Sequence, residues 1–346
     1  MKGQIAVVAG ATRGAGRGIA RMLGEAGATV YCTGRSSRTQ PNTTDHHYAG
    51  RPETIEETAA LVTQAGGTGI AVRVDHTVEA EVAALFARVK KEQQRLDVLV
   101  NILTGKPVAS WKSFWNLPLE DSRKFLDGWL WPHIVTCWHA APLMVARKSG
   151  LMVEIIEQDG IGYHGQFFFD LMEISLKRLS YGLAQELAPK GVTALAITPG
   201  FMRTEAILEQ FGVTEANWRE AAENNPEAKK WGFIASETPC FVGRAVAALA
   251  ADPNVHRKAG GAYASWTLSD EYGFIDIDGG RPHWGRYLLQ TTNGILDRGG
   301  PADPDERFWM KAVYGQFKRD ARYAEVKARI DAVMGPPVAD YDPRAS

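Results

Sequence analysis

Cysteine is scarce in this sequence of 346 residues, and no long apolar run interrupts it. Its three cysteines, Cys32, Cys137 and Cys240, lie far apart and form neither a CxxC pair nor a metal-binding spacing. They indicate buried free thiols in a reducing compartment. The apolar run at residues 5–8 is too short for a signal peptide or a membrane span. We therefore expect a cytoplasmic protein that does not associate with membranes.

An excess of charge of one sign is also lacking. The 39 basic and 40 acidic side chains leave a formal net charge of −1, which gives no electrostatic reason to expect binding to nucleic acid or to an anionic membrane surface. Hydrophobic residues make up 45% of the chain and charged residues 23%, a mixture typical of a globular protein with a sizeable core. No internal repeat or low-complexity tract is present.

Short apolar runs alternate with amphipathic stretches over the first two thirds of the chain. The runs predict strands at residues 5–9, 29–33, 69–74, 97–101, 151–156 and 192–197. The amphipathic stretches predict helices at residues 16–26, 53–65, 79–95, 119–147 and 167–188. In the last of these, one apolar stripe is expected from Leu171, Met172, Ser175, Leu176, Leu179, Leu183 and Leu187. This order predicts an α/β fold, a doubly wound parallel sheet with helices on both faces.

A glycine-rich segment, AGATRGAGRG at residues 9–18, follows the first predicted strand. Such a turn lets backbone N–H groups approach a pyrophosphate at a helix N-terminus, where the helix dipole favours negative charge. The glycines alone would be compatible with an ordinary tight turn. Because the order here is strand, turn, helix and second strand, we interpret the segment as a dinucleotide-binding turn.

The end of the second predicted strand distinguishes between the two nicotinamide dinucleotides. Sites that prefer NAD place an acidic residue about 20 residues past the glycines, to hold the ribose 2′-hydroxyl. Here the strand is followed by Arg35 and Ser36, and no acidic residue occurs before Asp45. Arg35 and Arg13 would bind a 2′-phosphate through charge-assisted hydrogen bonds, and the alternative is that both are ordinary solvated arginines. We predict NADP(H) as the cofactor.

Several motifs, in the expected order, resemble those of short-chain dehydrogenases/reductases. They are the turn Gly10-x-x-x-Gly14-x-Gly16, Asp75 after the third strand, LVN at residues 99–101 and PGFMRT at residues 199–204. The resemblance reaches to about residue 290 and implies a Rossmann-type fold, a small-molecule substrate and a homo-oligomer, either a dimer or a tetramer. It also implies that Asp75 touches the adenine, that Asn101 steadies the central strand, and that Pro199, Gly200 and Thr204 lie against the nicotinamide.

These considerations give one set of expected cofactor-binding residues and two expected regions of the chain. The cofactor-binding residues are Gly10, Thr12, Arg13, Gly14, Gly16, Arg35, Ser36, Asp75, Asn101, Pro199, Gly200 and Thr204. Residues 1–280 should form the NADP(H)-binding domain with its substrate cleft, and residues 281–346 a partly helical C-terminal extension. The amphipathic segment 303–334 of that extension would cover the cleft or contact another subunit.

The catalytic positions depart from the pattern of the family, which transfers hydride with an Asn-Ser-Tyr-Lys tetrad. Counting back from LAQEL at residues 183–187, the tyrosine position falls on Phe169 and the lysine position on Glu173. The serine position falls at residues 155–157, and the asparagine position on Trp129. None of the four is retained. Phe169 cannot donate a proton, and an anionic Glu173 would raise, not lower, the pKa of a neighbouring acid.

Two carboxyl groups facing a nicotinamide suggest a different substrate. Glu157 or Glu173 would stabilise an iminium or an amine-bearing compound, and either could deliver a proton if its pKa were raised. Tyr163 and His164 are alternative proton donors by location, although loop tyrosines and histidines more often serve as structural anchors. The candidate catalytic residues are therefore Glu157, Glu173, Tyr163 and His164.

Two further groups of residues have ordinary explanations beside functional ones. The pair His46 and His47 suggests a metal ligand, but no third ligand is suitably spaced, so we predict a polar surface loop and no metal. Four tryptophans could line an apolar substrate pocket or simply pack in a core or lid: Trp111, Trp115, Trp129 and Trp131.

Three functions are compatible with this sequence. The first is an NADPH-dependent oxidoreductase that reduces an imine, an iminium or an activated carbonyl or C=C bond with a rebuilt proton donor. The second is a non-redox lyase, cyclase or isomerase that uses Glu157 and Glu173 as acid and base. The third is a catalytically silent protein that binds NADPH. The first is our expectation, since the dinucleotide-binding motifs are intact and the replacements are acidic.

Overall fold

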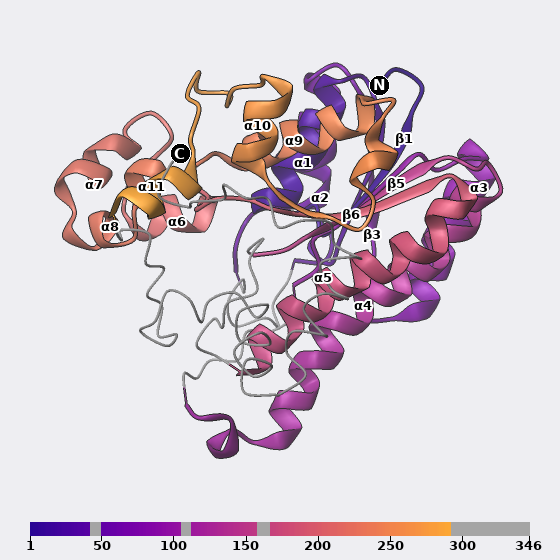
Figure 1. Ribbon diagram of the computed structural model, residues 1–346, viewed down its shortest axis with the longest axis horizontal. Helices are drawn as coiled ribbons and strands as arrows, with labels where there is room; N and C mark the ends of the chain where they lie inside the picture. Colours follow the sequence, from indigo (N-terminus) through magenta and orange to yellow (C-terminus); the bar gives the residue numbers. More distant parts are fainter. Residues whose placement is uncertain (42–49, 105–111, 158–166, 292–346) are drawn as a thin grey trace, which may run out of the picture.

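The computed structural model describes residues 1–41, 50–104, 112–157 and 167–291 (Figure 1). Within these residues, seven strands form one parallel sheet in the order β3-β2-β1-β4-β5-β6-β7. The strands are β1 (Ile5–Ala9), β2 (Thr29–Gly34), β3 (Thr68–Arg73), β4 (Val98–Asn101), β5 (Gly150–Ile155), β6 (Val192–Thr198) and β7 (Ala262–Ala264). The chain builds outward from β1 in one direction and then crosses to β4. In open α/β sheets, ligands bind at such a reversal, at the carboxyl ends of the strands, which here are those of β1 and β4.

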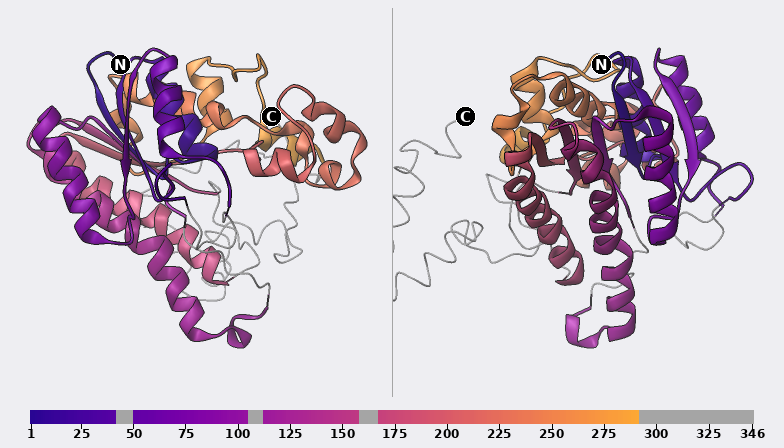
Figure 2. Two further views of the ribbon diagram at one scale, coloured as in Figure 1. Left: turned by 180° about the vertical axis from the view of Figure 1, so that it is seen from behind. Right: turned by 90° about the vertical axis from the view of Figure 1, so that its right-hand side faces the viewer.

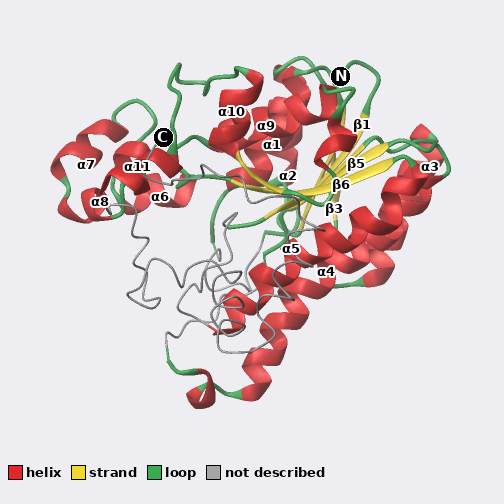
Figure 3. Ribbon diagram, in the orientation of Figure 1, coloured by secondary structure: helices red, strands yellow, loops and turns green. Residues whose placement is uncertain are grey.

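Helices cover both faces of the sheet, which confirms the predicted doubly wound fold (Figures 2 and 3). One face carries α1 (Gly14–Glu25), α2 (Ile55–Gln64), α9 (Pro239–Ala251) and α10 (Ser265–Tyr272). The other face carries α3 (Glu79–Gln93), α4 (Leu119–Val145) and α5 (Phe167–Leu187). The N-terminal part of α4 projects beyond the sheet and is preceded by the short 3-10 helix η1 (Phe114–Asn116).

The core is built from strands that are apolar on both sides. In β1, Ala6 and Val8 pack toward α1 and α9, whereas Ile5 and Val7 pack toward α3 and α4. Buried parallel strands are expected to be continuous apolar runs for this reason. The helices α1 and α9 meet closely at Gly18, where a Cβ atom would collide with the Pro239 carbonyl group.

The face of α5 that meets the sheet differs from the predicted stripe. Met172, Leu176 and Leu187 are buried as expected, but Leu171 is 39% exposed. The buried face includes Phe168, Glu173, Ser180 and Ala184 instead. The helix is therefore rotated relative to the apolar pattern, and this rotation places the carboxyl group of Glu173 inside the protein.

A small helical module extends from the carboxyl end of β6. It contains α6 (Glu205–Gln210), α7 (Trp218–Asn224), α8 (Pro226–Lys230) and the 3-10 helix η3 (Phe233–Ala235). Its core is largely aromatic, with Phe211, Trp218 and Phe233 buried together. The buried guanidinium group of Arg203 stacks on Trp218 and pairs with Asp278 at 2.8 Å. α11 (Trp284–Thr291) closes the module, with Trp284 against Phe201. The remaining 3-10 helices are η2 (Ala188–Lys190) and η4 (Val255–Lys258).

All three cysteines are buried free thiols, as the sequence predicted. Burial raises the pKa of Cys32 to about 12 and that of Cys240 to about 11. Burial and the nearby Glu154 carboxylate raise the pKa of Cys137 well above the ordinary thiol value. In the described part of the chain, no helix is both long and apolar enough to cross a lipid bilayer.

Candidate active site

The glycine-rich turn lies between β1 and α1, at the carboxyl edge of the sheet. Gly10 adopts a φ of 95°, which favours glycine, and a Cβ atom there would collide with the Ile102 carbonyl oxygen. A Cβ atom at Gly16 would in turn collide with the Gly10 carbonyl group. The two glycines therefore allow the turn to lie directly against the end of β4 and against the first turn of α1.

Hydrogen bonds from neighbouring elements hold this turn in place. The amides of Gly10 and Ala11 donate to the Thr33 carbonyl oxygen at 3.1 and 2.8 Å. The hydroxyl of Thr58, on α2, donates to the Ala11 carbonyl oxygen at 2.8 Å. Thr12 itself is buried beside Gly34 at the end of β2. The turn is thus a rigid part of the sheet edge.

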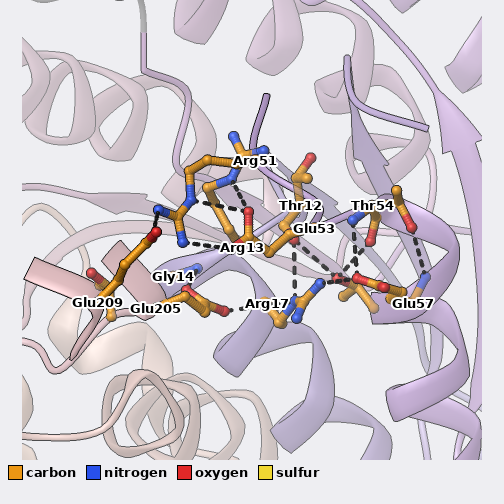
Figure 4. A network of polar contacts seen from close by, with 12 residues as sticks. Thr12, Arg13, Gly14, Arg17, Arg51, Glu53, Thr54, Glu57, Glu205 and Glu209 are labelled. Atoms are coloured by element: carbon orange, nitrogen blue, oxygen red, sulfur yellow. Dashed lines mark hydrogen bonds and ion pairs between the residues drawn. The ribbon is translucent and has the colours of Figure 1, made fainter. Parts of the chain in front are cut away.

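A cluster of guanidinium and carboxylate groups surrounds the turn (Figure 4). Arg13 Nε donates to Glu53 Oε2 at 3.2 Å, and Arg51 Nη2 donates to Glu53 Oε1 at 2.7 Å. Arg51 also reaches Glu209 of α6 at 2.6 Å. Burial opposes the ionisation of Glu53, but the hydrogen bonds from Arg51 and the charges of both arginines outweigh it and hold the Glu53 pKa below its ordinary value.

A second carboxylate from α6 lies at the N-terminus of α1. The Gly14 amide donates to Glu205 Oε2 at 2.9 Å, and Arg17 Nε lies 3.8 Å from Glu205 Oε1. The helix dipole and the unpaired N–H groups of a helix N-terminus favour an anion at this position. The site therefore already accepts a carboxylate where the sequence predicted a pyrophosphate.

The remaining residues predicted to bind adenosine lie at the ends of β2 and β3, which are neighbouring strands. Arg35 is half-buried directly after β2, and Ser36 is buried with its carbonyl group accepting from the Ile55 amide. Asp75 is half-buried after β3, where its carboxylate accepts from the Thr77 amide and hydroxyl. The structure thus brings these residues to the same edge as the glycine-rich turn.

The PGFMRT segment follows β6, at the same carboxyl edge of the sheet. The Gly200 amide donates to the buried carboxyl group of Glu237 at 3.0 Å, and burial raises the Glu237 pKa to about 8. Pro199 precedes this contact at the end of β6. Thr204 caps α6 and lies next to Gly14, since a Cβ atom built on Gly14 would be 3.4 Å from its methyl group. The glycine-rich turn and the PGFMRT segment therefore meet.

Glu157 and Glu173, which lie on different elements, are brought together at the end of β5. The Glu157 amide donates to Glu173 Oε2 at 2.9 Å. Glu157 is exposed, whereas only 3% of Glu173 is exposed. Burial, with the charge of Glu157, raises the Glu173 pKa to about 7, against the opposing effects of the amide hydrogen bond, Lys177 and His133.

Aromatic side chains form a wall close to this pair. Trp129 packs edge-to-face against Phe169, with ring centroids 6.1 Å apart, and in a tilted arrangement against Phe125, with centroids 5.2 Å apart. Trp131 is 55% exposed and Trp115 is 72% exposed, so both lie at the surface. Among the tryptophans considered from sequence, Trp129 is the one that the described structure places beside Phe169.

A buried polar network under the ends of β4 and β5 was not predicted from sequence. Asn101, at the end of β4, donates to Glu154 Oε1 at 2.8 Å, and Glu154 Oε2 bonds to His133 Nδ1. His133 Nε2 lies 2.9 Å from the Leu103 carbonyl oxygen. Glu154 interrupts an otherwise apolar strand, LMVEII, and this charged residue in a buried run was the available signal.

Comparison with known proteins agrees with this architecture. The family model described as short chain dehydrogenase matches residues 4–211. Dehydrogenase/reductase SDR family member 1 from Mus musculus is 35% identical over 286 residues, covering 81% of this chain and 85% of the mouse protein. The Homo sapiens protein of the same name is 33% identical over 290 residues, with the same coverage. This chain belongs to the short-chain dehydrogenase family.

Solved structures agree on the fold of this short-chain dehydrogenase. A short chain dehydrogenase from Mycobacterium thermoresistibile superposes with a TM-score of 0.65 at 19% identity, covering 82% of this chain and 92% of that one. The family model and the relatives at 33–35% identity confirm the family resemblance predicted from sequence. Members of the family are oxidoreductases that bind nicotinamide dinucleotides.

Some predicted residues of this short-chain dehydrogenase lie outside the described residues. These are Tyr163, His164, His46, His47 and Trp111, together with residues 292–346. Within the described ranges, no group of three or more His, Cys, Asp or Glu side chains is arranged to hold a metal ion.

Proposed function

We propose that this protein is an NADPH-dependent oxidoreductase that reduces an imine, an iminium or an activated carbonyl group of a small molecule. The observation that carries the proposal is the buried carboxyl group of Glu173, whose pKa is raised to about 7 and which bonds the Glu157 amide at the end of β5. A group with this pKa exchanges its proton near neutral pH, as a general acid requires. It stands where the resemblance places the lysine of the tetrad, four residues after Phe169.

The residues at the sheet edge fit a phosphorylated dinucleotide. Gly10 and Gly16 leave room for a close backbone approach, and the Gly14 amide already binds a carboxylate. Arg13 and Arg35 would hold the 2′-phosphate, with Asp75 toward the adenine and Asn101 beneath the cofactor. Pro199, Gly200 and Thr204 would border the nicotinamide. When bound, the reduced cofactor supplies a hydride to the substrate carbon.

The protein side chains supply the proton and the electrostatic environment. In this proposal the protonated carboxyl group of Glu173 gives its proton to the imine nitrogen, and solvent reprotonates the resulting carboxylate. The exposed carboxylate of Glu157 attracts a cationic substrate to the rim. Phe169 and Trp129 form an apolar wall that limits the access of water. An anionic site of this kind opposes alkoxide formation, so it favours C=N over unactivated C=O substrates.

The test is hydride transfer to a panel of cyclic imines, iminium salts and activated carbonyl compounds. We expect loss of NADPH absorbance, and with NADPH deuterated at C4 we expect deuterium in the amine product. Tight NADPH binding without turnover of any panel member would contradict the proposal. Turnover of a substrate that persists with a redox-inert NADPH analogue would instead indicate a non-redox lyase or isomerase.

A further inference from the structure

Four side chains form a polar network under the ends of β4 and β5. Glu154 Oε1 accepts from Asn101 Nδ2 at 2.8 Å and from the Cys137 thiol at 3.2 Å. Glu154 Oε2 contacts His133 Nδ1. His133 and Glu154 are each 1% exposed, so the network lies inside the protein. Buried ionisable groups of this kind require partners, and here every partner is a side chain of the network or a backbone carbonyl group.

The hydrogen bonds fix one ring proton of His133. A carbonyl oxygen can only accept, so His133 Nε2 carries a proton and donates it to the Leu103 carbonyl oxygen at 2.9 Å. Asn101 Nδ2 and the Cys137 thiol both donate to Glu154 Oε1. A further proton lies between Glu154 Oε2 and His133 Nδ1. With that proton on the ring, His133 is an imidazolium paired with the Glu154 carboxylate, and this placement is part of the proposal below.

This pair acts on two parts of the candidate site. Through Leu103, it holds the backbone that follows β4, and the Ile102 carbonyl group in that backbone touches Gly10 of the dinucleotide turn. A charge on His133 and a charge on Glu173 also favour each other, as the smallest of the influences on the pKa of either group. The pKa of Glu173 is influenced by three charged or titratable groups: Glu157, which follows β5, Lys177 on α5 and His133 on α4. The groups whose charges interact with that of His133 include Glu154, Glu173 and the neighbouring His76.

We propose that His133, held as an imidazolium by Glu154, is a positioning residue: it fixes residues 102–104 and supplies a buried positive charge toward Glu173. This inference rests on the proposed function, because it assigns the charge to the proton donor named there. In the family's tetrad, the lysine places a cation close to the site. Glu173 stands at that position in this chain, so the cation is missing there. In this chain the cation comes from α4 instead.

The first experiment measures the protonation of the histidine directly. In ¹⁵N-labelled protein, the ring nitrogens of His133 should both show the protonated signature throughout the neutral pH range. Assignment uses a His133→Gln variant. A His133 ring with one unprotonated nitrogen near neutral pH would overturn the proposal, whether or not the protein reduces any substrate.

The second experiment uses Glu154→Gln, which keeps hydrogen-bonding atoms but removes the charge. We expect the ¹⁵N signature of a neutral ring, a fall of about 10- to 100-fold in kcat with a smaller change in KM, and a rise in the pH at which kcat/KM declines. A matched control is His139→Gln, also on α4 but close to Glu79 on α3, which should leave all three readouts unchanged.

The outcomes separate the two proposals. An imidazolium at His133 in a protein that reduces no member of the panel would count against the proposed function alone. A Glu154→Gln protein with an unshifted pH profile and an unchanged kcat would count against the positioning role. This holds even if its melting temperature had fallen, because a pair with a purely structural role would change the stability of the protein and not the pH profile of its activity.

Discussion

At the scale of single residues, the carboxyl group of Glu173 can be tested by its pH dependence. A general acid is active while protonated, so activity should fall as pH rises through the Glu173 pKa of about 7. Glu173→Gln keeps the side-chain shape but has no proton to give. We expect its kcat on an imine to be about 100-fold lower and the decline near neutral pH to disappear.

The control for this prediction is Glu186→Gln, an exposed position on the same helix. It should leave both kcat and the pH profile unchanged. A Glu173→Gln protein that retained the wild-type profile would show that another group donates the proton.

The preference for a phosphorylated cofactor is also a prediction about single side chains. Replacing Arg13 or Arg35 with alanine removes a charge-assisted hydrogen bond to the 2′-phosphate, which is worth about 1.5–3 kcal/mol. We expect roughly 10- to 100-fold weaker binding of NADPH and little change for NADH, measured by calorimetric titration. Arg38→Ala, at an exposed position nearby, is the control. Equal losses for the two dinucleotides would contradict the assignment.

Residues whose role depends on local geometry could be identified from the sequence. Residues whose role depends on contacts between distant parts of the chain were harder to identify. Gly10 and Gly16 were identifiable because a strand-turn-helix order constrains the backbone directly. His133 was not, since its role depends on a contact between α4 and β5 that no local pattern encodes. Glu154 offered the signal of a charged residue in an apolar run, but that signal does not identify its partner. The position of Glu173 was predicted from the resemblance, but its burial was not, because the apolar stripe of α5 suggested a different rotation of the helix.

At the scale of elements, α6 supplies one carboxylate, that of Glu205, to the glycine-rich turn. Glu205 occupies the Gly14 amide that a pyrophosphate would use, so the two anions compete for one donor. Glu205→Gln removes the charge and weakens this competition, and we expect NADPH to bind roughly 2- to 5-fold more tightly. The effect should be measured as a change in Kd at constant ionic strength.

The matched control is Glu220→Gln, which removes an exposed charge from the adjacent helix α7. It should not change the Kd. If Glu205→Gln weakened NADPH binding instead, Glu205 would be holding the turn in its binding conformation and would not be a competitor.

The strands and helices up to β6 were predicted from periodicity with ends that differ by a few residues. Among the later elements, α6, α7, α8 and β7 were not predicted, for a physical reason. The three helices have 6, 7 and 5 residues, and β7 has 3, which is too few to display an apolar period. The three helices pack around an aromatic cluster that includes Phe233 and assembles in three dimensions. Helix α9 was also not predicted, although its 13 residues are enough to display a period.

For the whole molecule, buried carboxyl groups with raised pKa values predict how stability changes with pH. In the folded protein Glu237 stays protonated up to about pH 8, whereas in the unfolded chain it ionises near 4.5. Its contribution to stability is therefore present below pH 4.5 and is lost as pH rises toward 8. We expect the melting temperature to decline over this range.

Glu237→Gln provides the comparison, because its amide oxygen can still accept from Gly200 and Ser265 but does not titrate. The decline should be shallower in this variant. An identical pH dependence in both proteins would show that Glu237 is ionised in the folded state.

The domain boundary near residue 280 and the expected homo-oligomer stay predictions at this scale.

The burial of the three thiols has a practical consequence. Thiol reagents attack the thiolate, and at Cys32, Cys137 and Cys240 both the access of a reagent and the ionisation of the sulfur are suppressed. The native protein should therefore tolerate maleimides, and a single cysteine introduced on exposed α7 could carry a fluorophore without removal of the natural ones. That would allow the helical module beside the glycine-rich turn to be followed by fluorescence while a dinucleotide is titrated in.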